Sequence, residues 1–300
     1  MPLALSSNNP RADQRAAYAQ GYAEGGDFAA AADLMRQALE LAPDWAAGWT
    51  TLALHREKAG DREGAIAALR QAVELDPADG LGAGAKLAAL GEAPPPSALP
   101  PAFVRGLFDQ YAERFEQQLR DRLAYRAPEL LGEAIRAAGP GAFAAVLDLG
   151  CGTGLMGTVL RPLATRLVGL DLSPAMLAKA RAKGVYDALH ESDILAFAAE
   201  EDGFDLVVAA DVLNYLGDLA PVFARARRWL RPGGLLAFTL EAHAGAEPFV
   251  LRETLRYAHA AEAVSRQLAA AGFAASAPRH VHLREDRGEP VEGLIFTARG

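Results

Sequence analysis

The sequence predicts a chain of two parts, an α/β domain with a mostly parallel sheet that is preceded by an all-α domain. Three observations lead to this prediction. From residue 140 onward, apolar strand-like runs alternate with amphipathic helical stretches, which is the pattern of successive βαβ units. The apolar run over 144–150 ends in closely spaced glycines, and a repeat with a period of 34 residues occupies the first ninety residues.

Length and composition are consistent with two globular domains. The 300 residues exceed one typical domain, and a hydrophobic content of 51% is enough for sizeable cores. No apolar run approaches the roughly 20 residues that span a bilayer, so we expect no membrane partner. The first residues lack the basic and apolar regions of a signal peptide, and Cys151 is the single cysteine, so we expect a cytoplasmic protein. The net charge of −8 disfavours binding to nucleic acid.

The first ninety residues contain two copies of one helical unit. GDFAAAADLMRQALELAP (26–43) aligns with GDREGAIAALRQAVELDP (60–77), and nine of the eighteen positions are identical. Each copy predicts a turn, an amphipathic helix and a proline that opens the next helix. Residues 11–24 and 44–59 would then be the first helices of the two units, and 78–90 would cap the stack.

The period and the Gly-Asp turn resemble tetratricopeptide repeats, a family that usually presents a concave surface to a protein or a peptide. We expect such a domain over 1–91, followed by a proline-rich linker over 92–101. A generic helical bundle is the alternative fold for this part. A protein partner is one possible role for the repeats, and packing on the neighbouring domain or self-association are the others.

The second half of the chain alternates strands and helices. Strands are predicted over 144–150, 166–172, 185–190 (a weak one), 204–213 and 235–241. Helices are predicted over 155–164, 173–183, 219–230 and 252–272, and Ser173 caps the second of them. The tail over 275–300 predicts two strands around a polar turn at Gly288, so we expect an antiparallel end to the sheet. Ligands of such sheets bind beyond the carboxyl ends of the strands.

A glycine-rich loop follows the first of these strands. DLGCGTGLMG (148–157) contains the G-x-G-x-x-G spacing of a dinucleotide site at Gly152, Gly154 and Gly157. The carboxylate of Asp148 would repel a diphosphate but attract an ammonium or a sulfonium group. S-adenosylmethionine carries both cations, so Asp148 favours this cofactor over a nicotinamide dinucleotide.

Two further acids follow later strands. Asp171 ends the second strand 17 residues after Gly154, where a carboxylate can accept hydrogen bonds from both ribose hydroxyls. Asp193, in HESDIL (190–195), follows the third strand, where it can accept the proton of an adenine amino group. Apolar contacts to the adenine ring would come from Leu172, Met176 and Ile194. Each acid also has a structural interpretation, as the cap of a turn or as a solvated side chain.

Five segments in this order, VLDLGCGTG, GLDLSPAML, ESDIL, ADVLNYLGDL and LRPGGLLAFTLE, resemble the successive motifs of class I S-adenosylmethionine-dependent methyltransferases. Residues 104–131 and RYAH (256–259) also resemble a bacterial subgroup of predicted methyltransferases with N-terminal tetratricopeptide repeats. The resemblance implies a Rossmann-like sheet of seven strands with an antiparallel last strand. It places this domain over 102–300, with a helical lid over 102–139 and a core over 140–300.

The resemblance also implies which residues contact the cofactor. Gly150, Gly152 and Gly154 would shape the loop around the methionine arm, with Asp148 near its amino group and Cys151 as a small loop residue. Asp171 would hold the ribose, and Asp193 and Ile194 would frame the adenine.

Further implied contacts come from two other segments. Ala210, Asp211 and Tyr215 would lie under the reacting sulfonium, although Asp211 and Tyr215 could equally be structural. On a lid helix over 104–126, Tyr111 and Arg126 are candidates to contact the carboxylate of the cofactor.

Methyl transfer is a displacement in which alignment and desolvation supply much of the acceleration, so a weak base or none suffices. If a base is needed, His259 is the first candidate, near the start of the helix that follows the fifth strand. His280 and His282 share one face of a late strand, but no third ligand is evident, so we expect no metal.

The absence of two motifs narrows the possible classes of methyl acceptor. ADVLNYLGD lacks the Asn/Asp-Pro-Pro-Tyr stretch of adenine-N6 and glutamine methylases, and the single cysteine is not placed as in cytosine-C5 methylases. We therefore expect methyl transfer from S-adenosyl-L-methionine to the O, N or S atom of a small molecule, with S-adenosyl-L-homocysteine as product. The alternatives are a protein methyltransferase whose repeats recruit the target, a non-catalytic scaffold that binds the cofactor, and an NAD-dependent oxidoreductase.

Overall fold

The computed structural model describes residues 6–122, 125–139, 141–198, 203–286 and 288–300. The chain divides into two compact units, one ending at Phe103 and the other beginning at Val104. The N-terminal stretch that was expected to lack a signal peptide begins with residues 1–5, and these five residues lie outside the described residues. Within the described parts, no helix is both long and apolar enough to cross a membrane.

The first unit is all-α, as the repeat predicts. Its helices are α1 (Pro10–Glu24), α2 (Phe28–Leu41), α3 (Ala46–Lys58), α4 (Arg62–Leu75) and α5 (Ala83–Ala89). Asp27 caps α2 by accepting a hydrogen bond from the amide of Ala30, and Asp61 caps α4 in the same way. Gly26 and Gly60 precede these caps with the same left-handed φ of +84°. The repeated Gly-Asp pair is therefore one turn that occurs twice.

Three helices begin the second part of the chain. They are α6 (Pro101–Tyr111), which crosses the boundary between the units, α7 (Phe115–Arg122) and α8 (Ala127–Ala138). The single lid helix expected over 104–126 is thus wrong: α6 and α7 are separate, with Ala112–Arg114 forming a turn between them.

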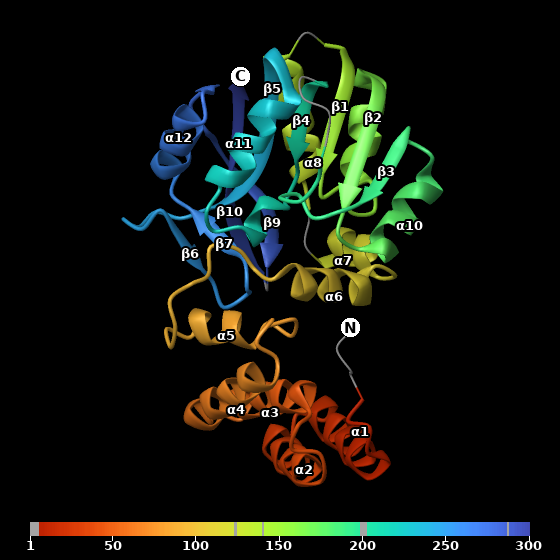
Figure 1. Ribbon diagram of the computed structural model, residues 1–300, viewed down its shortest axis with the longest axis vertical. Helices are drawn as coiled ribbons and strands as arrows, with labels where there is room; N and C mark the ends of the chain where they lie inside the picture. Colours follow the sequence, from red (N-terminus) through yellow and green to blue (C-terminus); the bar gives the residue numbers. More distant parts are fainter. Residues whose placement is uncertain (1–5, 123–124, 140, 199–202, 287) are drawn as a thin grey trace. The chain divides into compact units, whose positions relative to one another are not determined.

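The second unit is built on one sheet. Its strands are β1 (Phe143–Leu149), β2 (Ala164–Asp171), β3 (Ala188–Glu191), β4 (Phe204–Ala209), β5 (Leu230–Ala242), β6 (Phe249–Leu251), β7 (Tyr257–His259), β8 (Ala274–Ala275), β9 (Arg279–Asp286) and β10 (Glu289–Arg299). The order along the main path is β3-β2-β1-β4-β5-β10-β8 (Figure 1). Strands β1 to β5 pair in parallel, and β10 pairs antiparallel with β5. The predicted seven-strand path with an antiparallel last strand is confirmed. Three further strands lie off this path: β7 pairs with β5, β6 pairs with β7, and β9 pairs with β10.

Side chains of the central strands alternate between two apolar cores. Val146 of β1 packs with Leu131 and Ile135 of α8 on one face, and α9 (Leu155–Leu160) joins them there. Leu147 points to the other core, with Phe223 of α11 (Ala220–Trp229) and residues of α12 (Ala261–Ala270). Two short 3₁₀ helices, η1 (Arg161–Leu163) and η2 (Leu213–Tyr215), and helix α10 (Pro174–Lys183) complete the unit. Because both faces are covered, the central strands are mostly apolar, with Asp148 of β1 and Asp205 of β4 as exceptions.

The expected helix over 252–272 is wrong in its first half. The chain turns at Arg252–Arg256, where Leu255 has a φ of +55°, and then forms strand β7 before α12 begins. Ala258 pairs in parallel with Glu241 of β5, and the strand is buried. Pairing with a sheet edge thus overrides a local sequence pattern that is compatible with a helix.

Candidate functional site

The loop between β1 and α9 depends on three glycines with left-handed φ values. Gly150, Gly152 and Gly154 have φ angles of +59°, +54° and +88°. A Cβ on Gly150 would lie 2.2 Å from Cγ2 of Val212, whereas a Cβ on Gly152 would meet nothing within 4 Å. Gly150 is therefore needed for packing, and Gly152 leaves open space at the point where the loop faces a cavity.

Asp171 joins this loop to the end of β2. Its Oδ2 accepts a hydrogen bond from the amide of Gly152 and its Oδ1 accepts one from the amide of Ser173, each at 2.8 Å. Burial raises the pKa of Asp171, and these backbone amides act in the opposite direction. The carboxylate thereby holds the glycine loop and the start of α10 in one arrangement.

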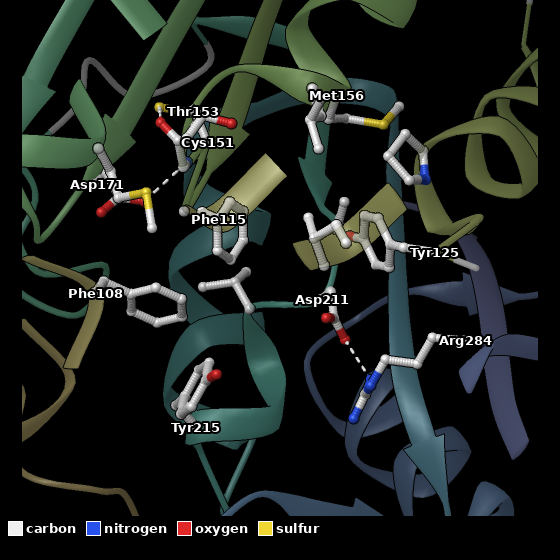
Figure 2. A pocket seen from close by; sticks show the side chains of 18 of the residues that line it. Phe108, Phe115, Tyr125, Cys151, Thr153, Met156, Asp171, Asp211, Tyr215 and Arg284 are labelled. Atoms are coloured by element: carbon white, nitrogen blue, oxygen red, sulfur yellow. Dashed lines mark hydrogen bonds and ion pairs between the residues drawn. The ribbon is translucent and has the colours of Figure 1, made fainter. Parts of the chain in front are cut away.

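The cavity lies at the carboxyl ends of β1, β2 and β4, where a sheet of this kind binds ligands. Its volume is about 170 Å³. Aromatic rings from α6 and α7 enclose it, and Figure 2 shows Phe108 and Phe115 directed into it. The lining residues are Phe108, Phe115, Leu119, Tyr125, Pro128, Gly150, Cys151, Gly152, Thr153, Leu155, Met156, Asp171, Met176, Ala210, Asp211, Val212, Tyr215, Arg256 and Arg284.

Asp148 lies behind the loop and is bonded to a tyrosine. The hydroxyl of Tyr186 donates to its Oδ2 at 2.7 Å, while its buried Oδ1 has no hydrogen-bond partner among the described residues. Burial raises the pKa of Asp148 to about 7, opposed by the Tyr186 hydrogen bond. A Cβ on Gly157 would lie 2.3 Å from the Tyr186 hydroxyl. The last glycine of the G-x-G-x-x-G spacing therefore makes room for this tyrosine.

Two other polar groups of the loop are buried. Burial raises the pKa of the Cys151 thiol well above its usual range, so the thiol is neutral. The Thr153 hydroxyl is buried without a hydrogen-bond partner in the described parts of the chain. Thr153 lines the cavity, so a bound molecule could satisfy this hydroxyl.

The opposite side of the cavity carries a cluster of charged residues, which we call the arginine cluster: Asp211, Glu241, Arg252, Arg256 and Arg284. Arg256 binds Glu241 through Nε and Asp211 through Nη2, and its Nη1 donates to the Tyr215 hydroxyl at 2.8 Å. Arg284 binds Asp211 through Nη1 at 3.4 Å and Glu241 through Nη2. Arg252 binds the second carboxylate oxygen of Glu241 at 3.3 Å.

Burial distinguishes the members of the cluster. The side chain of Glu241 is only 2% exposed, and that of Arg284 only 7%, whereas that of Arg252 is 39% exposed. Burial raises the pKa of Glu241, but the arginines Arg256 and Arg284 outweigh it, so the net shift is downward. Glu241 is therefore ionised inside the protein and is held by guanidinium groups.

Eight of the residues predicted to bind a cofactor line one cavity. They are Gly150, Cys151, Gly152, Asp171, Met176, Ala210, Asp211 and Tyr215. Gly154 belongs to the same loop and Asp148 precedes it, but neither lines the cavity, and Leu172 directly follows Asp171.

The other predicted contacts lie apart from the cavity lining. Oδ1 of Asp193 accepts from the amide of Leu195, and Ile194 packs against the core of the sheet. Tyr111 is 43% exposed at the end of α6. Arg126 is exposed, and its backbone amide donates to Leu283.

His259 is a buried residue of β7 and does not line the cavity. Its Nε2 lies 3.0 Å from the carbonyl oxygen of Leu216 and 3.2 Å from that of Gly217, just after η2. Burial lowers the pKa of His259 to about 4, against the effect of these carbonyls. The ring is therefore neutral and donates to the chain that follows Tyr215.

Sequence reasoning missed several residues of the site. Phe108, Phe115 and Tyr125 belong to the segment expected as a lid, where only Tyr111 and Arg126 were singled out. Glu241 ends a predicted strand, and Arg256 lies in a predicted helix and opens the RYAH stretch, but neither was expected in the site. No local signal points to Arg284. Within the described residues, no group of three or more His, Cys, Asp and Glu side chains could hold a metal ion.

Comparisons with known proteins agree with this architecture. Residues 147–238 match a family described as a methyltransferase domain, and residues 46–79 match a family described as a tetratricopeptide repeat. The fold is similar to that of a Burkholderia thailandensis 1,6-didemethyltoxoflavin-N1-methyltransferase with bound S-adenosylhomocysteine. The TM-score is 0.54 at 20% identity, and the match covers 66% of this chain and 87% of that one.

Two curated relatives match the second unit. The human methyltransferase-like protein 27 is 32% identical over 171 residues, which are 55% of this chain and 66% of that protein. A malonyl-[acyl-carrier protein] O-methyltransferase of Enterobacter lignolyticus is 39% identical over 97 residues, which are 32% of this chain and 39% of that protein. The chain thus spans less than two thirds of the length of either relative.

Proposed function

We propose that the chain transfers a methyl group from S-adenosyl-L-methionine to a small-molecule acceptor, on the premise that residues 147–238 match a methyltransferase domain. One observation carries the proposal. The glycine loop and Asp171 are joined by a hydrogen bond at the carboxyl ends of β1 and β2, and both line the same cavity. In sheets of this kind an acid after the second strand accepts hydrogen bonds from ribose hydroxyls.

The residues present fit such a cofactor. Gly152 leaves open space beside the cavity. A residue with a larger side chain at this position would fill that space. Asp148 does not line the cavity, so its contact with the ammonium group of the methionine arm stays a prediction. When bound, S-adenosylmethionine supplies an electrophilic methyl group on a sulfonium.

The chain's own residues would then bind and orient the reactants. Asp171 holds the ribose, the loop of Gly150, Gly152 and Gly154 follows the methionine arm, and Met176 provides apolar contact. Asp211 and Tyr215 lie on the acceptor side, and Phe108 and Phe115 exclude water. Adenine contacts by Leu172, Asp193 and Ile194, and carboxylate contacts by Tyr111 and Arg126, stay predictions. We assign no base to His259, because its ring is buried away from the cavity.

The acceptor class rests on the enclosure of the cavity. Aromatic rings and the buried arginine cluster surround it, which suits a small organic molecule rather than an extended polymer. The Enterobacter relative is named as a malonyl-[acyl-carrier protein] O-methyltransferase, and the Burkholderia protein is described with bound 1,6-didemethyltoxoflavin. Both names are consistent with a small acceptor group.

Calorimetric titration of S-adenosylmethionine, S-adenosylhomocysteine and NADH tests the cofactor. We expect micromolar binding of both adenosyl ligands, no heat from NADH, and a loss of about a hundredfold in affinity for Asp171→Ala, since charge-assisted hydrogen bonds contribute about 1.5–3 kcal/mol. Asp187→Ala is the matched control. Asp187 also accepts from a backbone amide, that of Leu167, but it does not line the cavity. A folded wild-type chain that binds neither adenosyl ligand would contradict the proposal.

A further inference from the structure

The cavity has two chemically different sides. The glycine loop, Cys151 and Asp171 form one side, and Asp211 and Arg284 form the other, as Figure 2 shows. Tyr125 and Tyr215 lie toward this second side. The proposed function assigns the first side to the cofactor, so the second side faces the methyl acceptor.

The second side is built from ion pairs between arginines and carboxylates. Three arginines, Arg252, Arg256 and Arg284, meet only two carboxylates, Asp211 and Glu241, among the described residues. Both carboxylates are shared: each of them binds Arg256 and Arg284. Arg252 is 39% exposed and does not line the cavity, so the two lining arginines, Arg256 and Arg284, are balanced by Asp211 and Glu241. An anion would therefore be bound through unused N–H donors of these arginines and not through an excess of buried charge.

The two arginines that line the cavity differ in what they can still bind. Each of the three nitrogens of Arg256 already has a partner, namely Glu241, Tyr215 or Asp211. Arg284 uses one Nη for each of its two carboxylates, while a guanidinium has five N–H donors in a planar fork. Arg284 therefore keeps N–H donors beyond those that bind Asp211 and Glu241, and it lines the cavity.

Two tyrosines can support the same anion. The Tyr215 oxygen accepts from Arg256, so its own proton is directed elsewhere. Burial raises the pKa of Tyr125 well above its usual range, and the pKa of Tyr215 is raised for the same reason, so both hydroxyls remain protonated donors. The rest of the lining near them is apolar, including Phe108, Phe115 and Pro128.

We propose that the methyl acceptor is a small carboxylic acid whose carboxylate binds Arg284, with its apolar body against the aromatic rings of the cavity. This inference rests on the proposed function, because it takes the glycine-loop side to be filled by the cofactor. Arg256 acts as a positioning residue, which holds Asp211, Glu241 and Tyr215 around the bound group.

The test compares acids with their uncharged amides. The wild-type chain is first saturated with S-adenosylhomocysteine and then titrated calorimetrically near neutral pH with three probe pairs: phenylacetate and phenylacetamide, benzoate and benzamide, and butyrate and butyramide. We expect at least one acid to bind about tenfold or more tightly than its amide. If every acid binds no better than its amide, the inference is overturned while the proposed function stands. If S-adenosylhomocysteine itself does not bind, it is the proposed function that fails.

Substitutions in the arginine cluster test whether the preference for acids over amides depends on Arg284. In Arg284→Gln the acid should lose its advantage over the amide, and Arg284→Lys, which keeps the charge but not the fork, should retain part of it. Arg252→Gln is the matched control, because it removes a positive charge from the same cluster at a residue that does not line the cavity. An equal loss in Arg252→Gln would mean that only the overall charge matters, and would overturn a site at Arg284.

Folding and cofactor affinity are measured for each variant. Arg284→Gln removes one partner from buried ion pairs with Asp211 and Glu241, so it should unfold at a lower temperature than the wild type. Its affinity for S-adenosylhomocysteine, measured below that temperature, should stay close to that of the wild type. A folded variant that no longer binds S-adenosylhomocysteine would place Arg284 at the cofactor and overturn the inference. If Arg284→Gln does not fold, Arg284→Lys and the comparison of acids with amides in the wild type still decide it.

Discussion

The two sides of the cavity are built in different ways. The glycine-loop side comes from one continuous stretch, 148–156, together with Asp171 at the end of the next strand. The arginine cluster is assembled from four distant segments: Asp211 follows β4, Glu241 lies on β5, Arg252 and Arg256 flank a turn, and Arg284 lies on β9. One side is a local backbone structure, and the other is a set of long-range ion pairs.

This difference predicts how substitutions affect each side of the cavity. Backbone amides and left-handed glycines make the first side, so a substitution there acts through steric fit and through the ligand. Buried charges make the second side, so removing one partner leaves another without compensation inside the protein. The following substitutions test that contrast, in order of decreasing expected effect.

The largest effect is expected for Glu241→Gln. It removes the 2% exposed carboxylate that binds three arginines and leaves their charge uncompensated. We expect a loss of about 3–5 kcal/mol in the free energy of unfolding, measured by urea denaturation. Glu247→Gln is the control, because Glu247 is exposed and pairs only at the surface, with His243, so its change should stay below about 0.5 kcal/mol. Equal losses in the two variants would show that the cluster contributes no more to the free energy of unfolding than a surface ion pair.

Asp148→Asn tests the buried acid of the loop side. With a pKa of about 7, the folded chain keeps on Asp148 a proton that the unfolded chain releases near pH 4. This group therefore lowers stability as the pH rises from about 4 to about 7, by up to roughly 4 kcal/mol. The groups that face it are Tyr186, Cys151 and Asp171.

The asparagine cannot ionise, so the variant should match the wild type near pH 4 and be more stable by a few kcal/mol near pH 8. Urea denaturation at both pH values measures this difference. A difference between the two proteins that does not change with pH would contradict the prediction.

A pair of alanine substitutions separates packing from binding within the loop. In Gly150→Ala the new Cβ would meet Val212 at 2.2 Å, so we expect a loss of about 3 kcal/mol in the free energy of unfolding. In Gly152→Ala nothing lies within 4 Å, so only the left-handed backbone costs about 1 kcal/mol. Its methyl group would instead enter the cavity and weaken binding of S-adenosylhomocysteine by about tenfold or more. Similar stabilities for the two variants would sink this distinction.

The smallest effect is expected for His259→Gln, and it has the opposite sign with pH. The folded chain keeps His259 neutral down to about pH 4, while the unfolded chain protonates it below about pH 6.5. The neutral ring of His259 therefore contributes fully to the free energy of unfolding above pH 6.5. This contribution is lost as the pH falls toward 4, by up to about 3 kcal/mol. Glu241 and His243 are the charged groups that act on the ring.

Glutamine can still donate to the Leu216 carbonyl but does not titrate, so the variant should lose less stability on acidification than the wild type. Unfolding measured near pH 7.5 and near pH 5 gives this comparison, with the exposed His280→Gln as the control. If the wild type and His259→Gln respond equally to acid, His259 is not the group that titrates.

The candidate site could be predicted where neighbouring residues determine it. The left-handed glycines, Asp171 at the strand end and the Ser173 cap all follow from a few adjacent residues. Glu241 could not be recognised, because its partners Arg256 and Arg284 lie 15 and 43 residues away in the chain. Arg256 was also obscured by the wrong helix over 252–272, which a single-sequence pattern could not tell from a short paired strand.

The sequence by itself determined the repeat with its Gly-Asp turns, the alternation of strands and helices along most of the second unit, and the glycine loop. These depend on backbone preferences, on capping and on the period of apolar residues, all of which act over a few positions. Only the tertiary structure decided which charges meet inside the second unit, how α6 and α7 close the cavity and where β7 pairs. Those features depend on which distant segments the sheet brings together, because burial and ion pairing are properties of contacts in space rather than of neighbours in the chain.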